Sequence, residues 1–196
     1  MKRFAIALAA TATLVVGCAT RDEEPLEPAA AVDPNSPIAA PGYMRMAASG
    51  DMFEIQSSQL ALQMSQNPMV RQFAQMMIAD HTRTSSEMMG LAQSLGLPPP
   101  PQMLAPHHQQ MLDQLRATPP HEFDSAYKQA QIMAHQEALT LHRNYAQQGD
   151  VPQLRDFAAR VVPAIEMHYS QAQGLPESAP PPMQQQPMPD RSGERG

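Results

Sequence analysis

Residues 68–98 read PMVRQFAQMMIADHTRTSSEMMGLAQSLGLP. Apolar residues recur there at spacings of three and four, so the stretch predicts one amphipathic helix with a buried face. Asn67 predicts the N-cap, with proline at the first helical position. Gly96-Leu97-Pro98 predicts a Schellman ending, because glycine accepts the left-handed conformation and proline cannot continue a helix. The residues on the buried line are Phe73, Ala74, Met77, His81, Ser85, Met88, Leu91 and Leu95.

Three further long helices are predicted from the same periodicity. The first covers about Tyr43–Ser65. The second begins near His121 and ends at Gly149, and the third is capped by Asp150 and ends at Gly174-Leu175-Pro176. No segment shows the alternating pattern of a strand, so the fold class is all-α.

A crossover rich in proline separates the second and third long helices. Pro98–Pro101 and Thr118-Pro119-Pro120 bracket one short amphipathic stretch, His107–Arg116. Short turns within each helix pair and a long connection between the pairs predict two αα-hairpins joined by a crossover that contains a short helix. This is the connectivity of a ferritin-like four-helix bundle, here over residues 43–175.

The first 18 residues predict export and lipidation. Lys2 and Arg3 form a basic start, residues 4–16 are apolar, and Val15-Val16-Gly17-Cys18 resembles the bacterial lipobox. That resemblance implies a signal peptide of residues 1–17 and a diacylglycerol thioether on Cys18, the single cysteine of the chain. We therefore expect anchoring to a membrane through the N-terminal lipid.

Segments rich in proline flank the predicted bundle. Residues 18–42 predict a lipidated cysteine followed by a tether, and residues 176–196, rich in proline and glutamine, predict a disordered tail. Ala19 rather than aspartate after the cysteine is typical of lipoproteins sorted to the outer membrane. The expected location is therefore the periplasmic side of the outer membrane of a Gram-negative bacterium.

Composition and motifs exclude several function classes. The chain has 13 Lys and Arg against 19 Asp and Glu, and no basic cluster follows its first three residues. Nucleic-acid binding is not expected, because phosphate contacts need clustered basic side chains. The sequence has neither the glycine motifs of nucleotide-binding loops nor a serine nucleophile elbow, and lipidation removes its one thiol. No catalytic residues are therefore predicted.

One glutamate and three histidines form the candidate metal site. Glu54 and His81 lie at similar distances from the turn between their helices, so they share one level in an antiparallel pair. His135 and His168 lie near the middle of the other pair. Imidazole nitrogen and carboxylate oxygen suit Zn²⁺, Fe or Cu, so the four residues predict a site for one transition-metal ion.

A hydrogen-bond network without metal is the alternative interpretation. A central histidine on an apolar face commonly donates to a carboxylate or to a tyrosine, as a Glu54–His81 pair would. A second network of this kind would comprise Asp124, Tyr127 and His135, and Asp80 is a further candidate supporting residue.

A carboxylate-bridged di-iron centre is not expected. Such centres use a Glu-x-x-His pair whose members share one helix face. Asp80 and His81 are adjacent, about 100° apart around the helix, and Glu166 and His168 are about 200° apart. Neither pair can chelate one ion, which leaves a mononuclear site as the metal hypothesis.

Methionine suggests a third hypothesis. The chain has 16 methionines, and thioethers bind Cu(I), so buffering of copper by methionine and histidine is an alternative function. Met77 and Met88 lie on the buried line, however, where methionine is a flexible core filler. His107 and His108 in the crossover are expected to be a solvated pair.

Short motifs in a fixed order resemble the DUF4142 family of exported bacterial proteins. The resemblance covers about residues 43–175 and implies a ferritin-like fold and an extracytoplasmic location, without an established activity. The combined expectation is a lipid-anchored envelope protein with a binding or scaffold domain and a role in stress, with metal binding, redox chemistry or copper buffering as alternatives. The matching motifs are Ala47-Ala48-Ser49-Gly50, Val70-Arg71-Gln72-Phe73-Ala74, Ile78-Ala79-Asp80-His81, Glu122-Phe123-Asp124-Ser125-Ala126-Tyr127 and Pro163-Ala164-Ile165-Glu166-Met167-His168.

Overall fold

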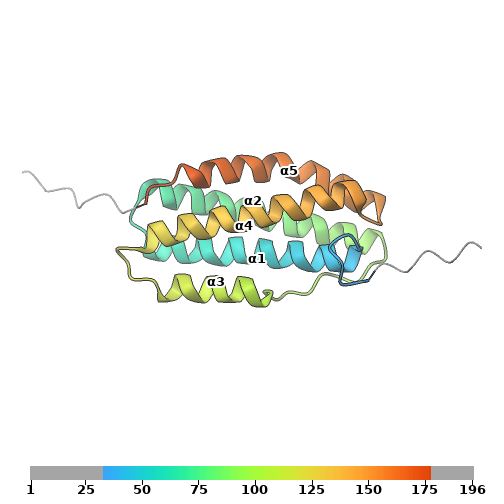
Figure 1. Cartoon of the computed structure of the whole chain (residues 1–196), viewed down its shortest axis with the longest axis horizontal. Helices are drawn as coiled ribbons and strands as arrows, with labels where there is room; N and C mark the ends of the chain where they lie inside the picture. Colours follow the sequence, from blue (N-terminus) through green and yellow to red (C-terminus); the bar gives the residue numbers. More distant parts are fainter. Residues whose placement is uncertain (1–32, 178–196) are drawn as a thin grey trace, which may run out of the picture. The chain divides into compact units, whose positions relative to one another are not determined.

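The computed structural model describes residues 33–177, and all regular structure in this part of the chain is helical (Figure 1). The all-α class is therefore confirmed for these residues. Cys18 and most of the C-terminal tail lie outside the described residues. The helices are α1 (Ala40–Met64), α2 (Pro68–Ser94), α3 (Pro106–Ala117), α4 (Phe123–Gln148) and α5 (Pro152–Gln173).

The four long helices lie side by side. Helices α1 and α2 form one antiparallel hairpin and α4 and α5 form another, while α1 also packs on α4 and α2 on α5 (Figure 1). The segment between α2 and α4 returns along the length of the helices. It carries α3, which packs against α1 and α4.

The two ends of α2 have the predicted caps. The side chain of Asn67 accepts a hydrogen bond from the backbone N–H of Met69 at 2.9 Å. At the other end, Gly96 has a φ of 65°, and the N–H of Leu97 donates to the carbonyl of Ala92 at 2.9 Å. This is the Schellman geometry that the glycine was expected to permit.

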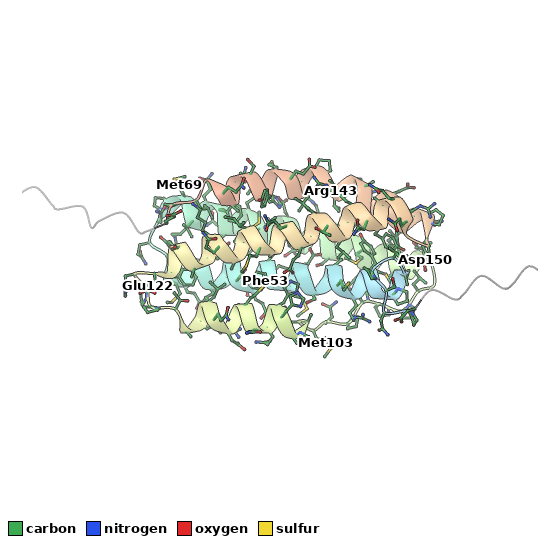
Figure 2. All side chains as sticks on the ribbon, in the orientation of Figure 1. Phe53, Met69, Met103, Glu122, Arg143 and Asp150 are labelled. Carbon is green, nitrogen blue, oxygen red and sulfur yellow. The ribbon has the colours of Figure 1, made fainter. Side chains whose placement is uncertain are left out.

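Two helix starts differ from expectation. Helix α1 begins at Ala40, earlier than its apolar periodicity indicates. The N-cap of α5 is Val151 rather than Asp150, because the Asp150 carboxylate accepts a hydrogen bond from the hydroxyl of Tyr145 at 2.9 Å. Asp150 and Glu122, which precede α5 and α4, lie at opposite ends of the helices (Figure 2).

Two apolar clusters separated by polar side chains fill the interior. On each long helix the two clusters use residues on either side of a central acidic or histidine side chain. Met77 and Met88 are fully buried, one in each cluster, which confirms their prediction as core residues. The first cluster includes Phe53, Val70, Phe73, Met77, Phe123 and Tyr127. The second includes Tyr43, Met44, Met88, Tyr145, Leu154 and Phe157.

None of the helices within residues 33–177 is both long enough and apolar enough to cross a membrane.

The backbone of Asn35 and Ser36 passes so close to the first turn of α1 that position 42 has room only for glycine. A Cβ at this position would lie 2.1 Å from the carbonyl oxygen of Ser36. We expect Gly42→Ala to lower the free energy of unfolding by about 1–3 kcal/mol, because backbone must move to make room. Gly90→Ala, where a Cβ meets nothing within 4 Å, should instead raise it by about 0.5–1 kcal/mol. Urea denaturation of both variants tests this, and equal effects would contradict it.

Candidate metal centre

Three buried histidines meet between the two apolar clusters. His81 comes from α2, His135 from α4 and His168 from α5, and we call them the central triad. One ring nitrogen from each lies within 4.8 Å of a ring nitrogen of the other two. The ring centroids are 5.6–5.9 Å apart. The structure therefore brings together the three histidines that the sequence placed at the middle of their helices.

Each ring of the central triad makes one hydrogen bond, to a carboxylate or to a backbone carbonyl oxygen. Ionised carboxylates and backbone carbonyls can only accept hydrogen bonds. The proton consequently sits on the bonded nitrogen of each neutral ring, and the opposite nitrogen carries a lone pair. The opposite nitrogens are His81 Nε2, His135 Nε2 and His168 Nδ1, all buried and without a hydrogen-bond partner in the described structure. The three bonds are His81 Nδ1 to Asp51 Oδ1 at 2.8 Å, His135 Nδ1 to the carbonyl oxygen of Gln131 at 2.8 Å, and His168 Nε2 to Asp80 Oδ2 at 3.0 Å.

Asp51 is the site residue that the sequence analysis missed. It is buried in α1, and its second oxygen accepts a hydrogen bond from Ser85 Oγ at 2.8 Å. The prediction of a Glu54–His81 hydrogen bond is therefore wrong, because Nδ1 of His81 bonds to Asp51 instead. The sequence contains a spacing that could have identified Asp51. Asp51 lies one turn before Glu54 on the same face of α1, and Ser85 lies one turn after His81.

Glu54 is a buried carboxylate, and the charge of His81 only partly offsets the cost of its burial. Neither of its oxygens has a hydrogen-bond partner among residues 33–177, and Oε1 lies 3.5 Å from Nδ1 of His135. Burial raises the pKa of Glu54 from 4.5 to about 7. An ionised Glu54 at this position therefore has a strong electrostatic requirement for a cation.

Burial and neighbours set the protonation of the triad. Burial, followed by the charge of His81, lowers the pKa of His135 to about 3. The same two causes lower the pKa of His168. Burial also acts to lower the pKa of His81, but the hydrogen bond and charge of Asp51 outweigh it and raise that pKa. At neutral pH, His135 and His168 are thus neutral rings with a free lone pair each, as metal ligation requires.

The second predicted hydrogen-bond network does not form. Tyr127 shares a hydrogen bond with Ser58 at 2.7 Å, and Oδ2 of the buried Asp124 has no partner within the described chain. Tyr127 and His135 are eight residues apart on α4, which separates them by about 12 Å along the helix axis. That separation is too large for the expected contact. Asp80 does support the site, through His168.

A cavity of about 880 Å³ connects the central residues with α3. Glu54, the central triad and the histidines of α3 all contribute to its lining. The prediction of a solvated His107–His108 pair is wrong for His108, which is buried and stacks on the ring of Phe53 with centroids 5.4 Å apart. The reason is that α3 turns this residue toward α1.

A family profile described as "Domain of unknown function (DUF4142)" matches residues 25–175, most of the chain. The chain belongs to this family. The resemblance predicted from the sequence motifs is thereby confirmed, and it extends further toward the N-terminus than those motifs did. No curated protein matches the chain.

Solved structures of CopM have a similar fold. The Cu(II)-bound form of CopM superposes with a TM-score of 0.60 at 21% identity, covering 69% of this chain and 94% of that one. The Ag-bound form has a TM-score of 0.58 at 20% identity over 69% and 93% of the two chains. The Cu(I)-bound form has a TM-score of 0.58 at 20% identity over 68% and 91%. At this identity the likeness concerns the fold.

Proposed function

We propose that this protein binds one transition-metal ion, copper being the favoured one, at the central triad. Glu54 is a nearby buried charge and not one of the three converging ligands, since its Oε1 lies 3.5 Å from Nδ1 of His135, the nitrogen opposite the one left free. The observation that carries the proposal is the set of three buried imidazole nitrogens that have no hydrogen-bond partner in the described structure and whose rings converge. Burying three ring nitrogens without hydrogen-bond partners is unfavourable unless something else satisfies them. A metal ion can bind all three nitrogens at once.

The surroundings of the triad support the same proposal. Metal-ligating histidines generally donate their second ring nitrogen to a carboxylate or a backbone carbonyl, which fixes the tautomer and the ring. Asp51, Gln131 and Asp80 supply those acceptors here. Glu54 adds a buried negative charge, and metal binding to the site would release protons from Glu54 and His81.

The choice of copper rests on two arguments. Three imidazoles suit Cu(II) and Zn(II), and Cu(II) is bound more tightly than the other divalent first-row ions by a given donor set. The solved structures of similar fold carry Cu(I), Cu(II) or Ag. We therefore propose copper as the ion to test first, beside Zn²⁺ and Fe²⁺.

We also propose the finer architecture and the location expected from the sequence. The helices α1, α2, α4 and α5 would form a ferritin-like four-helix bundle, supported by their pairwise packing. The chain would be a lipoprotein anchored through Cys18 on the periplasmic side of the outer membrane. Mass spectrometry of the processed N-terminus tests this, since cleavage before residue 18 and a diacylated cysteine are required.

Copper buffering by surface methionines receives less support. Of the exposed methionines among residues 33–177, Met46 lines the cavity and the others lie apart from it. The others are Met69, Met89, Met103, Met133 and Met167.

Elemental analysis tests the proposed function directly. The purified protein is loaded separately with Cu(II), Cu(I), Ag(I), Zn²⁺ or Fe²⁺, and loosely bound metal is removed with a weak chelator. We expect one tightly held equivalent of copper. Complete loss of every metal to the weak chelator would contradict the proposal.

Asp51→Asn tests whether the carboxylate of Asp51 supports His81 as a metal ligand. The amide can present its N–H₂ to His81, so the ring loses the acceptor that fixes its tautomer. We expect the affinity for Cu(II) to fall about 10–100-fold with helicity retained. Ser85→Ala, which removes only a donor to the Asp51 carboxylate, should change the affinity less. Competition with a chelator of known affinity measures both, and unchanged affinity in Asp51→Asn would argue that this carboxylate does not support a metal ligand.

A further inference from the structure

A second group of metal-ligating side chains lies at the rim of the cavity. His107 and His108 from α3 and Glu137 from α4 each offer one ligand atom, and these atoms lie within 4.8 Å of one another. Glu137 Oε2 is 3.2 Å from His107 Nε2 and 3.5 Å from His108 Nε2. We call these three residues the outer cluster. His107 and Glu137 are exposed, whereas His108 is buried.

His108 is prepared as a ligand by the segment that leads into α3. Its Nδ1 lies 2.7 Å from Ser49 Oγ, and the same hydroxyl accepts a hydrogen bond from the backbone N–H of Ala105 at 2.7 Å. Stacking on Phe53 fixes the plane of the ring. Nε2 is then directed at Glu137 with its orientation set.

The outer cluster and the central triad share one cavity. His135 and Glu137 are two residues apart on α4, and both line the cavity. Gly50 lines it between Ser49 and Asp51 on α1, and a Cβ there would lie 3.9 Å from Cε1 of His108. Because glycine has no side chain, α1 leaves the space open at this level.

The charges around the cavity favour a cation. Three arginines line the cavity: Arg83 is paired with Asp80 and Arg160 with Glu87, while Arg45 donates to the side chain of Asn35. Glu54 and Glu137 contribute negative charge without an arginine partner among the described residues.

We propose that the outer cluster is a second metal site, which binds a divalent first-row ion such as Cu(II) or Zn²⁺ more weakly than the central triad. Two imidazoles and one carboxylate suit such ions. The site is weaker because two ligands are exposed and α3 directs the positive end of its dipole toward it. The inference extends the proposed function by placing an exchangeable ion at the opening of the cavity, but the outer cluster can bind without the central triad.

The test is a Cu(II) titration of the purified protein, followed by equilibrium dialysis and electron paramagnetic resonance. We expect two equivalents in the unchanged protein, with the second at least about tenfold weaker. His108→Phe, which keeps an aromatic ring on Phe53, should lose the weaker equivalent and keep the tighter one. Glu137→Gln, at an exposed position that folding does not require, should weaken the second equivalent at least about tenfold. His121→Ala, in an exposed His121–Glu122 pair without a third ligand, is the matched control.

A separate variant distinguishes this proposal from the proposed function. His135→Leu should lose the tighter equivalent and retain the weaker one, so retention of one weak equivalent supports the outer cluster whatever the triad does. The proposal is overturned if the unchanged protein binds a single equivalent that His135→Leu removes. It is equally overturned if the second equivalent persists in both His108→Phe and Glu137→Gln.

Discussion

A His135→Leu variant is expected to lose the tightly held copper equivalent, with an affinity lower by at least about 100-fold. His135 is almost completely buried, and burial lowers its pKa to about 3, so it is a neutral ring with its lone pair available. Leucine has similar bulk and no nitrogen. Because the ring leaves one buried nitrogen without a partner, its replacement should leave the helices intact. Chelator competition and circular dichroism measure the two effects.

The control for this prediction is His121→Leu, which removes a histidine that is exposed and outside the triad. It should retain the tight equivalent. A His135→Leu variant that folds and still holds copper as tightly as the unchanged protein would show that the triad is a structural cluster. A hydrogen-bond role alone would then account for its burial.

A Glu54→Gln variant is expected to be more stable than the unchanged protein when metal-free at pH 8. The pKa of Glu54 is raised from 4.5 to about 7 by burial. A raised pKa contributes stability that is complete below pH 4.5 and is lost as the pH rises through 7. The shift corresponds to roughly 3 kcal/mol lost by pH 8. The neutral amide avoids that loss, so the difference between the two proteins should shrink toward pH 4.5.

Metal should reverse this order. An ion beside Glu54 compensates the buried carboxylate, so saturating copper should stabilise the unchanged protein more than Glu54→Gln. Glu166→Gln, at an exposed position, serves as a control and should change neither the metal-free pH profile nor the response to copper. Urea denaturation between pH 4.5 and 8, with and without copper, gives all of these values. Equal stability of unchanged protein and Glu54→Gln at every pH would contradict the interpretation of Glu54.

The pH dependence of the metal-free protein contains an opposing contribution from histidine. Burial lowers the pKa of both His135, to about 3, and His142, to about 4. A histidine with a lowered pKa contributes stability that is present above 6.5 and is lost as the pH falls through the lowered value. The comparison with Glu54→Gln cancels the contributions of His135 and His142, which both proteins share. The measured difference includes the coupling of Glu54 to His81, because the charge of Glu54 helps to raise the pKa of His81.

The parts of the fold that the sequence predicts well are those set by residues close together along the chain. Asn67 before Pro68 and the Gly96-Leu97-Pro98 ending are set by residues within a few positions, so the sequence identifies the limits of α2 closely. The start of α5 was less predictable, because Tyr145 takes the carboxylate of Asp150 and leaves Val151 as the cap. That competition involves the preceding helix, which cap rules do not include.

The candidate site was predictable in part for a similar reason. Helical periodicity and distance from the turns place His81, His135 and His168 at one level, and the structure brings them together. The rotation of α1 about its own axis is set by packing against three other helices, which a sequence does not reveal. That rotation directs Asp51, rather than Glu54, at His81. The burial of His108 likewise depends on how α3 packs against α1.

Diffraction from copper-loaded crystals, measured at the copper absorption edge, locates the bound ion relative to the central triad. We expect an anomalous peak within bonding distance of His81 Nε2, His135 Nε2 and His168 Nδ1, with Glu54 beside it. A peak confined to methionine sulfur atoms, or no peak among the three rings while copper is bound elsewhere, would contradict a metal centre at the triad.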